Sequence, residues 1–358
     1  MIEERVPLAP LTTLGLGGSA RYFVRAEHEA TVQGALRWAA ERSLPVAVLG
    51  GGSNLVISDA GFDGLVLAIA LRGVHSRVRG SCVEIDAAAG EPWDALCAHA
   101  VERDLAGIEC LSGIPGLVGA TPIQNVGAYG QEVAQVISAV RVLDRASLQL
   151  HTLGPEQCGF GYRASGFKRN PERCVVLAAT FALRLGGEPS VAYAELARAL
   201  SLRAGSAGGA APSLQQVRAC VLELRRGKSM LLDASDENGR SAGSFFLNPI
   251  VDAELADRVA ETAVAAGLIA RSDELPRYPA ADGRVKLAAA WLIERAGFRK
   301  GERRGAVGIS SRHALALVHH GGGRSAELLA FAREIQSRVQ QRFEVSLELE
   351  PVLLGFAS

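Results

Sequence analysis

The longest stretch without a charged residue, Cys110–Gln131, most constrains what this chain of 358 residues can fold into. The segment has enough residues to span a bilayer as a helix. However, Pro115, Pro122 and five glycines would interrupt a continuous apolar helix. A loop of this composition also has backbone N–H and C=O groups that need partners wherever water is excluded. The sequence therefore predicts an internal loop assembly whose backbone contacts another group, and a bound cofactor is such a group.

A second glycine-rich segment, Gly50–Asn54, lies between two short apolar runs and carries three glycines and two small polar residues. Successive N–H groups without neighbouring Cβ atoms can converge on an anion, as they do in phosphate-binding nests. A glycine-rich hairpin turn is the alternative interpretation, although such a turn needs fewer glycines. We favour the phosphate-binding interpretation.

Composition and charge exclude several classes of protein. With 38 basic and 38 acidic residues and 48% hydrophobic residues, the chain is predicted to be globular, without the net field that drives binding to nucleic acid or membranes. The six cysteines form no C-x-x-C pair, which argues against a zinc site and a disulfide framework. We therefore expect a cytoplasmic protein without a metal site, a nucleic-acid partner or a membrane partner.

Hydrophobic periodicity predicts an α+β first half and a smaller α/β or α+β second half. Helices are expected over residues 27–42, 91–103, 214–226, 252–266, 287–296 and 325–343. Strands are expected over residues 45–49, 140–144, 175–185, 315–318 and 345–349. The small-residue stretch 204–212 is typical of a flexible loop or linker, which predicts a domain boundary nearby.

Two short motifs resemble nucleotide-binding signatures but lack their context. Gly15–Ala20 satisfies G-x-G-x-x-A, yet a strand-like run follows it where a dinucleotide-binding motif requires a helix. Gly227-Lys228-Ser229 ends like a phosphate-binding P-loop, but Leu222 stands where the first glycine should be. Neither motif supports a Rossmann domain or a nucleoside triphosphatase.

Six segments occur together in an order that is similar to the UDP-N-acetylenolpyruvoylglucosamine reductase family. They are the two glycine loops, Thr12–Gly15, Tyr162–Lys168, Ala242–Pro249 and Leu347–Glu350. The resemblance extends from Leu11 to Gly355. It implies an α+β fold: an FAD-binding fold of the vanillyl-alcohol-oxidase type with two subdomains, followed by an α/β substrate-binding domain. The expected domains are residues 1–72, 73–212 with a lid insertion near 186–212, and 213–358.

The resemblance implies a catalytic role for Arg163, Ser244 and Glu350. Arg163 would pair with a substrate carboxylate, Ser244 would donate a proton, and Glu350 would act beside the serine, with Glu348 as the nearby alternative. The chain departs from the family pattern at Ala164, where an aspartate is usual, and at Pro351, where a valine is usual.

The resemblance also implies two sets of binding residues. Non-covalent FAD would contact Gly50, Gly51, Gly52, Ser53, Asn54, Ser112, Gly113, Ile114, Pro115, Gly116, Gly119, Ala120, Gln124, Asn125, Gly127, Ala128 and Tyr129. The nucleotide-sugar substrate would contact Tyr162, Tyr193, Lys228, Asn248, Lys286 and Glu294, with Tyr193 on the lid.

The implied reaction reduces the enolpyruvyl ether of UDP-N-acetylglucosamine to UDP-N-acetylmuramate for peptidoglycan synthesis. NADPH would pass hydride to flavin N5, which would deliver it to the terminal vinyl carbon, and a monomer is expected. Two alternatives stay open: an FAD-dependent oxidase of the same fold acting on an alcohol or sugar, and a non-catalytic nucleotide-sugar-binding protein.

Overall fold

The computed structural model describes residues 1–204 and 211–356 and divides the chain into two compact units. The first unit comprises residues 1–6, 20–52 and 63–232. The second comprises residues 7–19, 53–62 and 233–358, so both units combine segments that are distant in sequence. Most of the predicted linker 204–212 lies outside the described residues, as does part of the predicted lid insertion.

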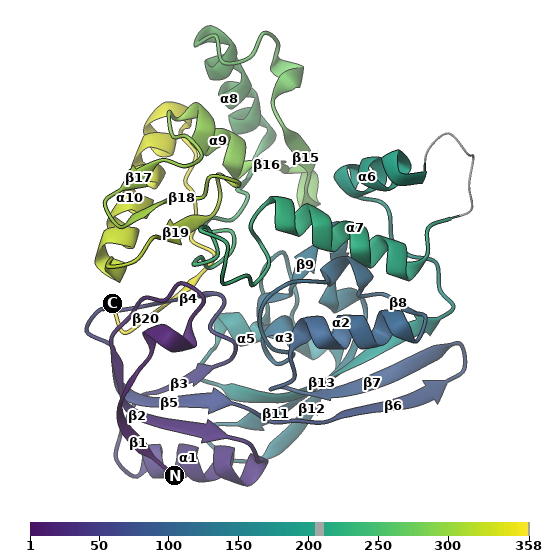
Figure 1. Ribbon diagram of the computed structural model, residues 1–358, viewed down its shortest axis with the longest axis vertical. Coiled ribbons are helices and arrows are strands. Elements are labelled where there is room, and N and C mark those ends of the chain that lie inside the picture. Colours follow the sequence, from purple (N-terminus) through teal and green to yellow (C-terminus); the bar gives the residue numbers. More distant parts are fainter. Residues whose placement is uncertain (205–210, 357–358) are drawn as a thin grey trace. The chain divides into compact units, whose positions relative to one another are not determined.

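The described part of the first unit contains two larger β-sheets and one two-stranded sheet (Figure 1). The strand order of the smaller sheet is β1 (Glu3–Pro7), β2 (Ser19–Ala26), β5 (Phe62–Ile69) and β3 (Val46–Leu49). The strand order of the larger sheet is β12 (Leu150–Leu153), β11 (Ile137–Asp144), β13 (Cys174–Leu185), β7 (Cys82–Ala88) and β6 (Val74–Arg79), with β8 (Leu105–Ala106) also pairing with β13. A short hairpin pairs β9 (Gly127–Ala128) with β10 (Gln131–Glu132).

The helices of the first unit supply much of its apolar core. They are α1 (Glu29–Ala40), α2 (Trp93–Glu102), α3 (Ala120–Gln124), α4 (Pro155–Cys158), α5 (Gly166–Arg169), α6 (Ala194–Ala204) and α7 (Leu214–Gly227). In α1, Val32, Leu36 and Ala39 recur at helical spacing and are buried together with β2, β3 and β5. The predicted helix and strand at residues 27–49 are thus confirmed by α1 and β3.

The second unit surrounds its own apolar core. Its helices are α8 (Ala253–Ala265), α9 (Ala289–Arg295) and α10 (Ser325–Phe343). Its described strands form three small sheets. The strand order of the first is β14 (Ile250–Val251), β16 (Val285–Leu287) and β15 (Arg277–Pro279), and that of the second is β17 (Arg303–Arg304), β18 (Val307–Ile309) and β19 (Leu317–His319). The third pairs β20 (Val352–Leu354) with β4 (Leu55–Ile57). Short 3-10 turns complete the two units at Ala9–Leu11, Glu109–Leu111, Val133–Gln135, Ser272–Glu274 and Ala281–Gly283.

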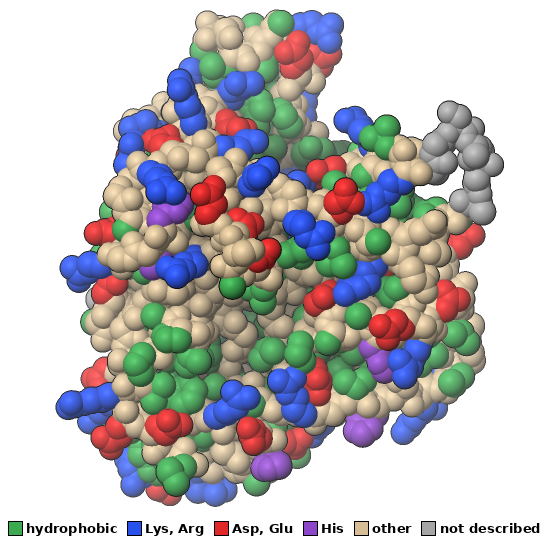
Figure 2. Space-filling model, in the orientation of Figure 1, with side chains coloured by type: hydrophobic (Ala, Val, Ile, Leu, Met, Phe, Trp, Pro, Cys, Tyr) green, Lys and Arg blue, Asp and Glu red, His purple; other side chains and the backbone are tan. Residues whose placement is uncertain are grey.

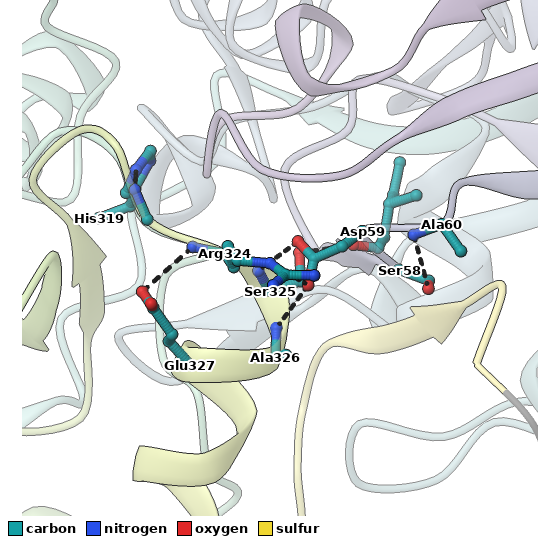
Figure 3. Close-up of polar contacts among 10 residues, drawn as sticks. Ser58, Asp59, Ala60, His319, Arg324, Ser325, Ala326 and Glu327 are labelled. Atoms are coloured by element: carbon teal, nitrogen blue, oxygen red, sulfur yellow. Dashed lines mark hydrogen bonds and ion pairs between the residues drawn. The ribbon is translucent and has the colours of Figure 1, made fainter.

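Segment 53–62 is held in the second unit by β4 and by a helix cap (Figure 3). The Asp59 carboxylate accepts the N–H groups of Ser325 at 2.8 Å and Ala326 at 3.0 Å, at the start of α10. A carboxylate there satisfies donors that the helix leaves free and complements its dipole. The Ser325 hydroxyl donates in turn to the carbonyl of Ile57. These bonds connect the N-terminal half of the sequence to the C-terminal helix.

The predicted strand 345–349 is wrong. Val345 and Leu347 are buried while Ser346 and Glu348 are exposed, so the alternation that suggested a strand is real. Instead of a sheet ladder, the segment makes one isolated bridge, Leu349 with Phe246. The carbonyl of Leu347 accepts a hydrogen bond from the Gln336 side chain of α10 at 2.7 Å. Backbone pairing is limited to the Leu247 N–H with the Glu348 carbonyl and the Glu350 N–H with the Phe245 carbonyl, so the Gln336 side chain supplements a pairing that is too short to form a strand.

The compact units differ from the predicted division at residue 213. Helix α7 begins at Leu214, directly after that boundary, yet it belongs to the first unit. Its buried residues Val217, Cys220 and Val221 pack with Cys110 and with Leu196 of α6. The three-part division into domains stays a prediction.

Candidate active site

The two glycine loops approach each other within the first unit. A Cβ atom at Gly51 would lie 2.8 Å from the Cα of Gly116, which is closer than real Cβ atoms pack. Only glycine at position 51 therefore allows the two backbones to come this close. The close approach brings Gly50–Gly52 and Gly113–Gly119 to one place, as the predicted cofactor site requires.

Side chains of α2 and α7 hold the second glycine loop in place through hydrogen bonds and an ion pair. The Asp94 carboxylate accepts the Gly113 N–H at 2.6 Å and pairs with both terminal nitrogens of Arg218, at 2.6 and 3.0 Å. The indole N–H of Trp93 donates to the carbonyl of Leu111 at 3.0 Å. These contacts join residues up to 124 positions apart, so no sequence pattern relates Asp94 to Arg218. The acidic first turn of α2 was the one available signal.

The ion pair determines the protonation of Asp94. Burial alone would raise the pKa of its carboxyl, but the hydrogen bonds from Arg218 and Gly113 outweigh burial and hold the pKa below its ordinary value. A depressed folded-state pKa contributes stability above the unfolded pKa of about 3.9, and that stability is lost as the pH falls through the folded pKa.

We therefore expect Asp94→Asn to lower the melting temperature by roughly 3–8 °C at pH 7, because a charge-assisted bond network is lost. The deficit should shrink below about pH 4, because the unfolded wild-type carboxyl takes up a proton there while the folded one holds its charge to a lower pH. Calorimetric melting of both proteins at pH 7 and pH 3 measures this. An equal deficit at both values would contradict the role of the Asp94 charge.

A buried network missed by sequence reasoning supports the next part of the same segment. The Glu109 side chain is fully buried and accepts hydrogen bonds from the N–H groups of Gly107 and Ser190, each at 2.8 Å, and from the Gln131 amide at 2.7 Å. Cys110 completes the network, because its N–H donates to Gln131 and its thiol to the carbonyl of Ser190. The stem of the predicted lid is thus attached to the glycine-rich segment.

The loop residues fit the phosphates of FAD. Within the described residues, the N–H groups of Gly50, Gly51 and Gly52 donate no hydrogen bond, so they are available to an anion. Arg225 of α7 is buried beside Gly113, and burial lowers its pKa. Its Nε is a buried donor without a partner among the described residues. Free donors next to two glycine loops are what an anionic cofactor would satisfy.

Other predicted cofactor residues have structural partners in the first unit. The Asn125 side chain donates to Glu132 at 2.9 Å and to the carbonyl of Gly161 at 2.8 Å, and its backbone φ is +40°. Ser112 is buried and donates to the carbonyl of Glu109, while Gln124 accepts from Lys168. Asn125 and Ser112 therefore shape the loop through bonds of their own.

Arg163 lies beside the same loop in a strained backbone conformation. Its φ is +49°, and Tyr129 also has a φ of +49°, both uncommon for residues other than glycine. The Arg163 guanidinium donates to the carbonyls of Asn125 and Gly127 and lies 5.7 Å from the Tyr162 ring centre. Strain of this kind persists where the surroundings enforce it, and it often marks functional positions.

Three predicted residues meet near the C-terminal end of α7. The rings of Tyr129 and Tyr193 contact edge to face with centres 5.5 Å apart, and the Lys228 ammonium lies 5.8 Å from the Tyr129 ring. Burial raises the pKa of Tyr129 to about 12, so its hydroxyl is neutral at physiological pH. Lys228 follows the last residue of α7 and pairs with Glu195 of α6 at 2.6 Å. Sequence reasoning did not identify Glu195.

The second unit carries Ser244 and Glu350 on neighbouring segments. Glu350 donates its backbone N–H to the carbonyl of Phe245 at 3.1 Å, and its own carbonyl accepts from the Asn54 amide at 3.2 Å. Ser244 is half-buried between Gly243, with φ of +73°, and the fully buried Phe245. Glu350 is half-buried, whereas Glu348 is exposed.

The predicted substrate residues of the second unit lie around β16 and α9. The Asn248 side chain accepts the N–H of Ala289 at the start of α9, at 2.9 Å. Lys286 lies in β16, opposite Ile250 and Tyr278. Glu294 of α9 lies 3.9 Å from Lys300. The structure therefore groups Ser244, Asn248, Lys286, Glu294 and Glu350 in the second unit, and groups Tyr162, Arg163, Tyr193 and Lys228 in the first.

The described surface adds few other candidates for chemistry. No group of three or more His, Cys, Asp or Glu residues within 1–204 and 211–356 could hold a metal ion. In the same ranges no helix combines the length and apolarity needed to cross a membrane. On the face shown in Figure 2, basic and acidic side chains are interspersed.

Comparison with known proteins agrees with this geometry. Residues 20–153 match the family model of an FAD binding domain, and residues 234–354 match the model described as UDP-N-acetylenolpyruvoylglucosamine reductase, C-terminal domain. The chain is therefore a flavoprotein with FAD as its cofactor, and the predicted flavin-binding fold with a second domain is confirmed.

Individual relatives match over almost the whole chain. UDP-N-acetylenolpyruvoylglucosamine reductase of Saccharopolyspora erythraea is 48% identical, over 98% of this chain and 95% of that protein. The protein of the same name from Streptomyces coelicolor is 48% identical, over 98% and 90%. The crystal structure of the reductase from Thermus caldophilus aligns with a TM-score of 0.66 and 25% identity, over 99% of this chain and 100% of that one. The chain belongs to the UDP-N-acetylenolpyruvoylglucosamine reductase family.

Proposed function

We propose that this protein uses NADPH to reduce the enolpyruvyl ether of UDP-N-acetylglucosamine, giving UDP-N-acetylmuramate for peptidoglycan synthesis. The observation that carries the proposal is the meeting of the two glycine loops beside the free N–H groups of Gly50–Gly52, in a chain of this family. When bound, FAD supplies the hydride transfer between NADPH and the vinyl carbon. The balance is one hydride from NADPH and one proton, which together saturate the double bond and release NADP.

The chain's own residues have separate tasks in this proposal. Arg163 pairs with the carboxylate of the enolpyruvyl group and holds the negative charge that develops there, for which a guanidinium is well suited. Ser244 donates a proton to the carbon next to that carboxylate. A serine hydroxyl is a weak acid, so it needs a strongly basic carbon and a charged neighbour. Glu350, whose segment is bonded to that of Ser244, is the proposed neighbour.

Binding residues complete the proposal. Lys228 contacts the nucleotide diphosphate as a compact point charge. Tyr193, whose side chain is 44% exposed, closes over the nucleotide from the lid, and Tyr162, Asn248, Lys286 and Glu294 contact the remaining substrate. FAD is held without a covalent bond by the two glycine loops.

The visible spectrum of the purified protein tests the proposal. We expect a yellow protein that bleaches anaerobically with NADPH and releases its colour into the supernatant on acid precipitation. An oxidase would instead bleach with an alcohol or sugar and not with NADPH. A colourless protein that binds the nucleotide sugar without consuming NADPH would support a binding protein instead.

A further inference from the structure

Four side chains of the first unit form a cluster that joins the lid to α7. Tyr129 belongs to the glycine-rich segment, Tyr193 and Glu195 to the lid, and Lys228 follows α7. Helices α6 and α7 lie side by side and share a small apolar core that includes Leu196 and Val221 (Figure 1). Because Leu196 is fully buried, the backbone at the neighbouring Glu195 is held in place.

The Glu195–Lys228 pair is short but partly open to solvent. The carboxylate lies 2.6 Å from the ammonium, and the two side chains are 40% and 32% exposed. Ion pairs of this exposure contribute little net stability and exchange partners readily. Glu195 also lies in the first turn of α6, an 11-residue helix, where the helix dipole favours a negative charge. Its carboxylate can therefore leave Lys228 at a small loss of free energy.

We infer that Glu195 is an internal competitor for Lys228 that sets the affinity of the nucleotide diphosphate. The inference rests on the proposed role of Lys228 as a diphosphate ligand. An incoming diphosphate must take Lys228 from Glu195, and it then experiences repulsion from a carboxylate nearby. On product release, Glu195 pairs with Lys228 again. Glu195 acts through Lys228 and is a positioning residue.

The chain offers a matched control for this effect. Arg203 of α6 pairs with Glu223 of α7, so a second ion pair joins the same two helices. Neither Arg203 nor Glu223 is a proposed substrate-binding residue, and this second pair does not include the tyrosine cluster of Tyr129 and Tyr193. If Glu195 acted only by fastening α6 to α7, removing the Glu223 charge would have the same consequence.

Calorimetric titration of the FAD-loaded enzyme with UDP tests the inference. Glu195→Gln should tighten UDP binding by about 2- to 10-fold, because the pair and its repulsion are both removed. Glu195→Asp should bind UDP like the wild type, and Glu223→Gln should leave the Kd unchanged. The gain of Glu195→Gln should shrink at high ionic strength, where exposed charges are screened. Equal FAD content in all variants serves as the control for folding.

Variants of Lys228 separate the competitor role of Glu195 from the role of Lys228 as a diphosphate ligand. Lys228→Met should weaken UDP binding, and adding Glu195→Gln to it should tighten binding less than it does in the wild type, because the ion pair is already gone and only the repulsion is removed. If Lys228→Met weakens binding but Glu195→Gln does not tighten it, or Glu223→Gln tightens it equally, the competitor role is wrong while Lys228 keeps its assignment. If Lys228→Met leaves the Kd unchanged, the assignment of Lys228 fails and the inference fails with it.

Discussion

Ser244→Ala is expected to slow reduction of the enolpyruvyl substrate by about 10²–10⁴-fold, the range for losing a positioned proton donor. The serine has no chemical task while NADPH delivers its hydride, so bleaching by NADPH should keep its normal rate. The larger end of the range is expected, because Arg163 and Glu350 can hold the developing charge but do not supply the proton. Stopped-flow measurement of the two half-reactions separates these effects.

The structure indicates that Ser244→Ala removes the hydroxyl without disturbing the fold around it. Phe245 and Phe246 are fully buried in the core of the second unit, and the N–H of Phe245 donates to the carbonyl of Leu315 at 2.7 Å. The backbone that follows residue 244 therefore keeps its place when one hydroxyl is removed. Ser241→Ala, four positions before Phe245, is the control and should change either rate by about fivefold or less. Normal reoxidation by the substrate in a Ser244→Ala protein with its full complement of FAD would contradict the proton assignment.

Gly51→Val is expected to abolish FAD binding. A Cβ there would lie 2.8 Å from Gly116 Cα and 3.3 Å from its carbonyl carbon, and neither backbone atom can rotate away. The two glycine loops must separate, and the N–H groups proposed to hold the cofactor phosphates separate with them. The ratio of bound FAD to protein after purification measures the effect.

A glycine without such a neighbour provides the control for Gly51→Val. A Cβ on Gly34, in α1, meets nothing within 4 Å, so Gly34→Ala should retain all its FAD. Replacing this helical glycine should also stabilise the protein by about 0.5–1 kcal/mol. A cooperatively folded Gly51→Val protein with a full complement of FAD would refute the placement of the cofactor at these loops.

Local elements were predictable from the sequence because their signals are local. Helix α1 shows its apolar face at regular spacing, and the strand-like run after Gly15–Ala20, confirmed as β2, correctly argued against a dinucleotide-binding motif. The extended segment 345–349 was mistaken for a strand, because alternation reports which face is buried but not what satisfies the backbone.

Long-range support of the candidate site was beyond sequence reasoning. The Asp94–Arg218 pair and the buried bonds of Glu109 to Ser190 join positions that no periodic pattern relates. The glycine loops themselves were predicted, but their mutual approach at Gly51 and Gly116 depends on tertiary packing. The Glu195–Lys228 pair was missed for the same reason, since an acidic residue in the first turn of a helix is ordinarily a solvated one.

The central claim is that this chain reduces an enolpyruvyl nucleotide sugar in two separable steps. In the most direct measurement, the purified enzyme is reduced with one equivalent of NADPH in the absence of oxygen. The NADP that forms is then removed. UDP-N-acetylglucosamine enolpyruvate is then added, and absorbance and product are followed together. We expect the yellow colour to return with one lactyl ether, UDP-N-acetylmuramate, formed per FAD. Flavin that stays reduced with this substrate, or that regains its colour without forming the lactyl ether, would contradict the claim.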